Sequence, residues 1–220
     1  MGSGTFRSMN EIQSHRLPWW FKITYTTFLA ILIPVYWRSY GPTNFSYFCD
    51  VSLALTLISV WTEWALPVSM AAVGIVLPQL FWCVDFLFRA CGVHLTGMTD
   101  YMFDPRHPLY LRALSMFHGW LPFVLLFMVG RLGYDRRALV RWTLLAWALC
   151  LVAYFFLPPA GAVLSNPDLP RNVDYVFGMN DAEPQHWLPQ PVYLLVWMLA
   201  LPALLYFPAH RMLGRFFGRR

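Results

Sequence analysis

The stretch WALPVSMAAVGIVLPQLFWCVDFLF, residues 64–88, carries one charged side chain, Asp85, over its whole length. A helix needs roughly 20 mainly apolar residues to cross a hydrocarbon core about 30 Å thick. A helix buried in a soluble domain seldom stays apolar on every face for this distance. The stretch therefore predicts a transmembrane helix.

Working outward from this stretch, five more apolar runs have similar length and composition. They cover residues 19–37, 44–61, 109–129, 142–157 and 192–207. Tryptophans mark several of their ends (Trp19, Trp20, Trp37, Trp61 and Trp64), where indole rings settle at a membrane interface. Hydrophobic residues make up 58% of the chain and charged residues 12%, about half the usual share of a soluble domain. We expect an all-α fold, a polytopic bundle of six transmembrane helices.

The sequence predicts a single domain. The first eight residues, MGSGTFRS, are interpreted as an added leader before a natural start at Met9, and residues 9–220 as a single six-span transmembrane domain. The four cysteines form no CxxC pair. Their spacing therefore predicts neither a disulfide framework nor a zinc site.

Charged residues predict the orientation. Arginines gather in the loop at residues 131–141 and in the tail after residue 207, whereas the loop at residues 158–191 is mainly acidic. Short loops rich in Arg and Lys stay in the cytoplasm, so we expect both termini there, in a bacterial cytoplasmic (inner) membrane. The net charge of +5 is explained by these flanks, and we expect no nucleic acid as a partner.

Three ionisable residues lie inside predicted spans: Asp50, Asp85 and His118. Such groups are costly in lipid and are functional candidates by default. The predicted topology places all three towards the outer side. The structural alternatives are an ion pair of Asp85 with Arg89 on the next helical turn, and a His118 that is simply satisfied in the core.

Cys49 and His118 together offer a nucleophile and a general base, the minimum for acyl transfer through a thioester. Asp50 follows Cys49 directly and points about 100° away around the helix, so we expect it to orient a third group rather than touch the sulfur. Asp85 would hold the histidine tautomer, as the acid does in a catalytic triad. We assign substrate binding to Ser52, Ser115 and Arg112.

The reaction requires no metal and no organic cofactor. A metal site built from Cys49, Asp50, His118 and Asp85 would mix hard and soft ligands in a way that suits zinc poorly.

Four short motifs carry a resemblance to a known family. They are NFSYFCDVSLAL (residues 44–55), LSMFHGWLPF (114–123), LGYDRRA (132–138) and NVDYVFG (172–178). In order and approximate spacing they resemble segments of the transmembrane protein 164 family. The more distant androgen-induced protein family is similar in having six spans, and the chain also resembles a branch of bacterial membrane proteins.

The resemblance implies an activity and roles for single residues. Transmembrane protein 164 relatives are membrane acyltransferases that use a cysteine and a histidine, and androgen-induced proteins hydrolyse fatty-acid esters with a threonine and a histidine. Carried over, Cys49 would be the nucleophile and His118 the base. Asn172 and Tyr175 match the family's third segment, and we assign them to substrate binding as well. This chain departs from the pattern before Cys49, where Tyr47-Phe48 replaces a histidine pair.

Two other classes of function stay open. A proton-coupled transporter could use Asp50, Asp85 and His118 as a relay, and six short spans would then favour a homodimer. A non-catalytic membrane protein for binding or assembly could use the loop at residues 158–191 as its contact surface. The enzyme hypothesis instead names a membrane lipid as the substrate.

Overall fold

The computed structural model describes residues 17–166 and 168–218, and the described part is all-helical. The leader and Met9 lie outside the described residues. The main helices are α1 (Trp19–Tyr40), α2 (Phe48–Thr62), α3 (Ala65–Ala90), α4 (Leu109–Ser115), α5 (Phe117–Leu132), α6 (Ala138–Phe156), α7 (Gln190–Ala200) and α8 (Phe207–Phe217). Short 3₁₀ turns lie at η1 (Pro42–Ser46), η2 (Asp100–Met102) and η3 (Val173–Tyr175), and the π-helical segment η4 (Leu201–Tyr206) joins α7 to α8.

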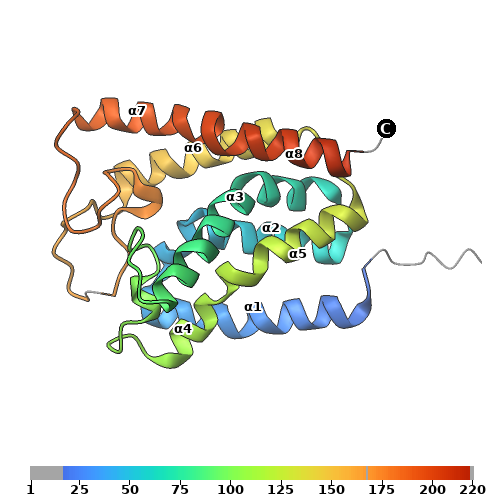
Figure 1. Cartoon of the computed structure of the whole chain (residues 1–220), viewed down its shortest axis with the longest axis horizontal. Coiled ribbons are helices and arrows are strands. Elements are labelled where there is room, and N and C mark those ends of the chain that lie inside the picture. The colour runs from blue at the N-terminus through green and yellow to red at the C-terminus, as the bar shows by residue number, and fades with distance from the viewer. Residues whose placement is uncertain (1–16, 167, 219–220) are drawn as a thin grey trace, which may run out of the picture.

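The helix α3 forms the centre of the bundle, and α2, α5 and α6 pack around it (Figure 1). The helix α1 flanks α2 on one side, and α7 and α8 lie along α6 and α3 on the other. Gly74 permits the tightest contact, because a Cβ atom there would lie 2.0 Å from the buried indole of Trp142 on α6. The mainly apolar stretch that predicted the fold is thus the helix with most neighbours.

Four described helices are long and apolar enough to cross a membrane: Ala65–Ala90, Leu109–Leu132, Ala138–Phe156 and Gln190–Phe217. The helix α2 is apolar but shorter, at 15 residues. The prediction of an all-helical chain with the character of an integral membrane protein is therefore confirmed at this level.

The second predicted span begins four residues later than expected, at Phe48, and the fifth begins four residues earlier, at Ala138. Two other predicted spans differ more from the structure. The fourth is interrupted at Met116, where α4 ends and α5 begins. The sixth does not end at Phe207, because the helix continues through the arginine-rich tail to Phe217.

The two ends of the bundle differ and are named here for later use. At the Glu63 end, α2 turns into α3, α1 begins and α8 ends (Figure 1). At the Cys49 end, α2 begins, α3 ends and the long loops at residues 91–108 and 157–189 gather (Figure 1).

Candidate functional site

The first turn of α2 is completed by a residue far away in the sequence. The backbone N–H of Phe48 donates to Oδ1 of Asp174 at 3.1 Å, across 126 residues. The first N–H groups of a helix need acceptors, which a local Ser, Thr, Asp or Asn usually supplies. Tyr47 holds the N-cap position here and makes no such side-chain bond. The loop segment η3 therefore fixes the position of Cys49 and Asp50.

The backbone of η3 is strained. Asn172, Asp174 and Tyr175 have φ angles of 50°, 57° and 61°, a left-handed conformation that costs non-glycine residues energy. The amide of Asn172 holds the turn, because it donates to the carbonyl of Gly178 at 2.8 Å and accepts from the N–H of Phe177 at 2.9 Å. Asn172 thus shapes the loop from a buried position.

Side chains of α7 hold the same segment from the other side. The indole of Trp197 donates to the carbonyl of Asp174 at 2.9 Å, and the hydroxyl of Tyr193 donates to the carbonyl of Tyr175 at 3.2 Å. Strain that is held from two sides often marks a functional segment. In this fold it sets the carboxylate of Asp174 against the start of α2.

The thiol of Cys49 lies against a carboxylate. Its Sγ atom is 3.5 Å from Oδ2 of Asp50, and Nδ2 of Asn44 donates to the same oxygen at 3.4 Å. The prediction that Asp50 would point away from the sulfur is therefore wrong. The two Cα–Cβ bonds diverge around the helix, but the carboxylate is long enough to fold back onto its neighbour.

Several buried polar atoms near this end have no hydrogen-bond partner among the described residues. They belong to Asp50 (Oδ1), Ser52 (Oγ), Gln79 (both amide atoms), Trp82 (Nε1) and Asp174 (Oδ2). Buried polar groups are nearly always paired, and each exception needs a reason, such as a catalytic or binding role. Burial also raises the pKa of Asp174 well above its usual range, with a smaller contribution from nearby Asp50.

His118 lies on α5, in an aromatic setting. Its ring stacks on Phe117 and Trp82, with centroids 4.0 Å and 5.4 Å away. Its Nδ1 atom is 2.8 Å from the carbonyl of Ser115, which can only accept, so the proton is assigned to Nδ1. In the neutral ring this leaves a lone pair on Nε2, the form that a general base needs.

Proline shapes the helix next to this histidine. Pro122 has no N–H to donate to the carbonyl of His118 four residues earlier. The thiol of Cys83 on α3 lies 4.0 Å from that carbonyl and 3.7 Å from the carbonyl of Gly119.

The hydrogen bonds do not join the predicted pair directly. Within residues 17–166 and 168–218, Cys49 bonds to Asp50 and His118 bonds to Ser115, and no bond joins the two side chains. Tyr101, from the loop after α3, lies close to Ser115 and Trp82 and interacts electrostatically with Cys49. Burial raises the pKa of this phenol, so its hydroxyl keeps its proton. Tyr101 therefore links the surroundings of the thiol to those of the histidine.

Asp85 has a different partner from the one predicted. Its two oxygens accept from the N–H and hydroxyl groups of Thr96 and Thr99, at 2.6–3.0 Å. These four bonds hold the loop after α3, and His118 bonds instead to the carbonyl of Ser115 at the end of α4. The alternative ion pair with Arg89 is not formed either, because Arg89 lies 2.7 Å from Asp100.

Some of the predicted substrate-binding residues lie near Cys49 or His118, and others hold the surrounding loops in place. Ser115 is buried and bonds to the hydroxyl of Tyr36 at 2.8 Å. Arg112 donates to the carbonyl of Met102 at 3.2 Å, which fastens the loop over α4. Tyr175 lies in the strained segment, near enough to Cys49 for an electrostatic interaction.

Asp174 and Tyr101 were not among the candidates from the sequence. For both residues the sequence contains a feature that could have pointed to them. Asp174 lies inside the motif NVDYVFG, between two residues that were chosen, and Tyr101 lies in the stretch TDYMFDPRH between the third and fourth spans. Loop residues are hard to assign to a membrane site because periodicity does not show which of them fold back into the bundle.

The described residues include no group of three or more His, Cys, Asp and Glu side chains placed to hold a metal ion. Two surface hollows also lie away from Cys49. One is an apolar groove between α6 and the α7–α8 helix, and the other is a polar hollow around residues 132–137 at the Glu63 end. Comparisons with protein-family models, with curated proteins and with solved structures found no match.

Proposed function

We propose that the chain is a six-span membrane protein of a bacterial cytoplasmic membrane, with both termini in the cytoplasm. The spans would be α1, α2, α3, α4–α5, α6 and α7–α8. At 22 residues α1 is about 33 Å long, and the 15 residues of α2 reach about 22 Å, with η1 adding length before it. The arginines of the 131–141 loop and of α8 lie at the Glu63 end, which supports a cytoplasmic location for that end.

We propose further that the Cys49 end performs acyl chemistry on a membrane lipid, as an acyltransferase or an ester hydrolase. The observation that carries the proposal is the contact between the Cys49 thiol and the buried Asp50 carboxylate, with unpaired oxygens of Asp50 and Asp174 nearby. The resemblance to the transmembrane protein 164 family supports the same assignment of nucleophile and base.

The chemistry would run through a thioester. The sulfur of Cys49 forms a bond to the acyl carbon, the ester C–O bond breaks, and the thiol proton passes through a side-chain base to the leaving alkoxide. An acceptor alcohol or water then attacks the thioester and returns a proton to the sulfur. Burial and the neighbouring carboxylate of Asp50 disfavour a stable thiolate at Cys49, so the thiol proton must leave during the attack.

Two side chains could serve as that base. Asp50 already contacts the thiol, and His118 carries the lone pair on Nε2. The neutral hydroxyl of Tyr101 is suited to donate to the oxyanion that forms on the acyl carbonyl.

The test is acyl labelling of the purified protein in nanodiscs with a lipid-tailed p-nitrophenyl ester. Wild type should take up label that neutral hydroxylamine releases, as a thioester does. Cys49→Ala should lose this label, and His118→Ala or Asp50→Asn should slow its uptake by about 100-fold or more. Cys83→Ala is the matched control, because this half-buried thiol on α3 lies near the same histidine. Equal labelling of Cys49→Ala and Cys83→Ala would exclude the thioester mechanism.

A second candidate, a proton-coupled transporter, is favoured by the two buried carboxylates Asp50 and Asp174. Their unpaired oxygens could load and release a proton, whereas Asp85 is engaged by threonines. In vesicles loaded with a pH-sensitive dye, a carrier would lose proton flux in Asp50→Asn and Asp174→Asn and keep it in Cys49→Ala. An enzyme would lose acyl labelling in Cys49→Ala and would show no proton flux in wild type.

A further inference from the structure

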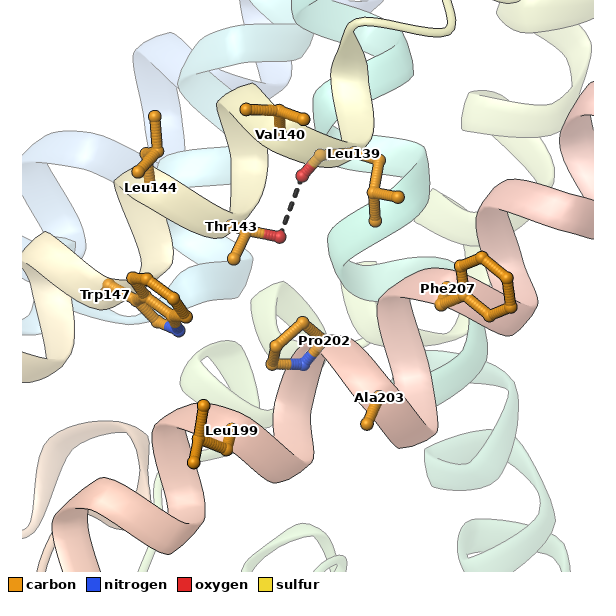
Figure 2. Close-up of a pocket in the computed structure, with 9 residues that line it drawn as sticks. All are labelled: Leu139, Val140, Thr143, Leu144, Trp147, Leu199, Pro202, Ala203 and Phe207. Carbon is orange, nitrogen blue, oxygen red and sulfur yellow. Dashed lines mark hydrogen bonds between the residues drawn. The ribbon is translucent and has the colours of Figure 1, made fainter.

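An apolar groove runs between α6 and the α7–α8 helix, in the half of the bundle nearer the Glu63 end. Its volume is about 470 Å³, within the roughly 300–1,000 Å³ of typical ligand pockets. Figure 2 shows its lining residues on two facing helices: Leu139, Val140, Thr143, Leu144, Trp147, Leu199, Pro202, Ala203 and Phe207. None of them belongs to the candidate site around Cys49.

The groove is shaped by a break in regular helix geometry. Pro202 lies in the π-helical segment and has no N–H for the carbonyl of Met198, four residues earlier. The indole of Trp147 donates to that carbonyl at 2.6 Å and ties the two helices together. Ala203 lines the groove next to Pro202, and its small side chain leaves space between the two helices (Figure 2).

The lining offers almost no polar group to a ligand. The hydroxyl of Thr143 donates to the carbonyl of Leu139 at 2.8 Å, back into its own helix (Figure 2). The nitrogen of the Trp147 indole is taken by Met198. A groove with such walls is suited to a hydrocarbon chain rather than to a polar molecule.

Positive charge gathers at one end of the groove. The guanidinium of Arg211 lies 5.8 Å from the ring centroid of Phe207, which lines the groove. Arg136 and Arg211 both lie close enough to His210 to interact with it electrostatically. Exposed Arg141 follows Val140, another lining residue. Guanidinium groups are the preferred partners of phosphates.

We propose that this groove binds one acyl chain of an anionic phospholipid, with the lipid phosphate at Arg211. The occupant comes from the leaflet that faces the Glu63 end, where the arginines lie. Hydrocarbon burial holds the chain, and the guanidinium selects an anionic headgroup over a zwitterionic one. The inference does not depend on the chemistry proposed for Cys49, which lies at the other end of the bundle.

The test uses nanodiscs with a trace of photoreactive lipid that carries a diazirine near the middle of one acyl chain. Matched phosphatidylglycerol and phosphatidylcholine probes are compared, and cross-linked peptides are mapped by mass spectrometry. In wild type we expect cross-links in residues 139–147 and 199–207, with about a five-fold preference for phosphatidylglycerol. Equal cross-linking by the two probes would overturn the proposal.

Two pairs of variants separate the groove from ordinary contact with bulk lipid. Ala203→Trp fills the groove and should reduce these cross-links about five-fold or more, while Leu204→Trp on the exposed neighbouring position should not. Arg211→Gln should abolish the headgroup preference, and Arg215→Gln one helical turn further on should keep it. Ala203→Leu replaces Ala203→Trp if the larger residue prevents monodisperse elution. An equal effect of the substitutions at positions 203 and 204 would show that only bulk lipid reaches this face.

Discussion

The charged side chains buried at the two ends of the bundle differ in how they are paired. At the Glu63 end, the polar side chains around the α2–α3 turn are paired: Lys22 lies 2.7 Å from Glu63, and the hydroxyl of Ser59 donates to the carbonyl of Trp64 and accepts from the N–H of Val68. At the Cys49 end Asp50 and Asp174 keep buried oxygens without a partner among the described residues. Paired buried groups stabilise the fold, whereas buried groups without a partner need another explanation, such as a catalytic or binding role. The contrast supports our proposal that the Glu63 end stabilises the fold and that the chemistry takes place at the Cys49 end.

Strain follows the same division. At the Glu63 end, Glu63 is in the left-handed region with φ of 53°, and its carboxylate accepts a hydrogen bond from the ammonium of Lys22. Lys22 is also covered by the rings of Trp19 and Trp61. At the Cys49 end three non-glycine residues of the motif at residues 172–178 have positive φ, and two of them, Asp174 and Tyr175, lie near enough to Cys49 to interact with it electrostatically. At the Glu63 end the strained residue forms the tight turn between α2 and α3. At the Cys49 end the strained residues lie in the segment that caps α2 beside the candidate site.

The largest expected effect in the protein's stability is at the Glu63 end. Lys22→Met leaves a partly buried carboxylate without its ammonium, so we expect a loss of about 3 kcal/mol in the free energy of unfolding. SDS titration followed by circular dichroism measures this loss. The rate of Cys49 labelling at low temperature should stay within about two-fold of wild type. A large fall in labelling by folded Lys22→Met would break the division between the two ends.

A smaller effect is expected at the cap of α2. Asp174→Ala removes the acceptor of the Phe48 N–H and should cost about 1–2 kcal/mol in unfolding free energy. Asp174→Asn keeps an oxygen that can accept the same bond, so its stability should stay near wild type. The same SDS titration compares the two variants. An equal loss in both variants would show that the cap of Asp174 on α2 is not what stabilises the fold.

The smallest effect concerns pH. The pKa of Asp174 is raised in the folded state, chiefly by burial. The folded chain therefore holds this proton more tightly than the unfolded chain, whose aspartate has a pKa of about 3.9. The stabilisation is complete below that pH and is lost as pH rises through the folded pKa. We expect the melting temperature of wild type to fall across this range, and Asp174→Asn to reduce the slope. An unchanged slope would mean that other groups set the pH dependence.

The sequence predicted the helices well where apolar runs are long. The span expected at residues 64–88 is α3, Ala65–Ala90. The span expected at residues 142–157 is α6, Ala138–Phe156, which begins four residues earlier than predicted. The break at Met116 has no glycine or proline of its own, so no local signal marked it. The helix through the arginine-rich tail was missed because the prediction ended where the apolar run ends, at Phe207, just before Pro208.

The candidate site could be predicted only in part. Cys49, Asp50 and His118 were chosen because polar groups inside spans are costly, a rule that needs no knowledge of contacts. Their partners depend on how loops fold back: Asp85 bonds to two threonines and Asp174 reaches α2 from a distant loop. Contacts across such distances carry no periodic signal in the sequence.

The bond between Phe48 and Asp174 also sets an order of events during synthesis. Domains form from the N-terminus as the chain leaves the ribosome, and α2 emerges 126 residues before the side chain that caps it. A nascent chain that ends before Asp174 already contains Cys49, Asp50, Tyr101 and His118, but its second helix still lacks the acceptor for its first turn. The segment around Asp174 is held in turn by Tyr193 and Trp197 of α7. The candidate site is therefore assembled last, and a ribosome-stalled fragment would carry the candidate residues without the geometry that brings them together.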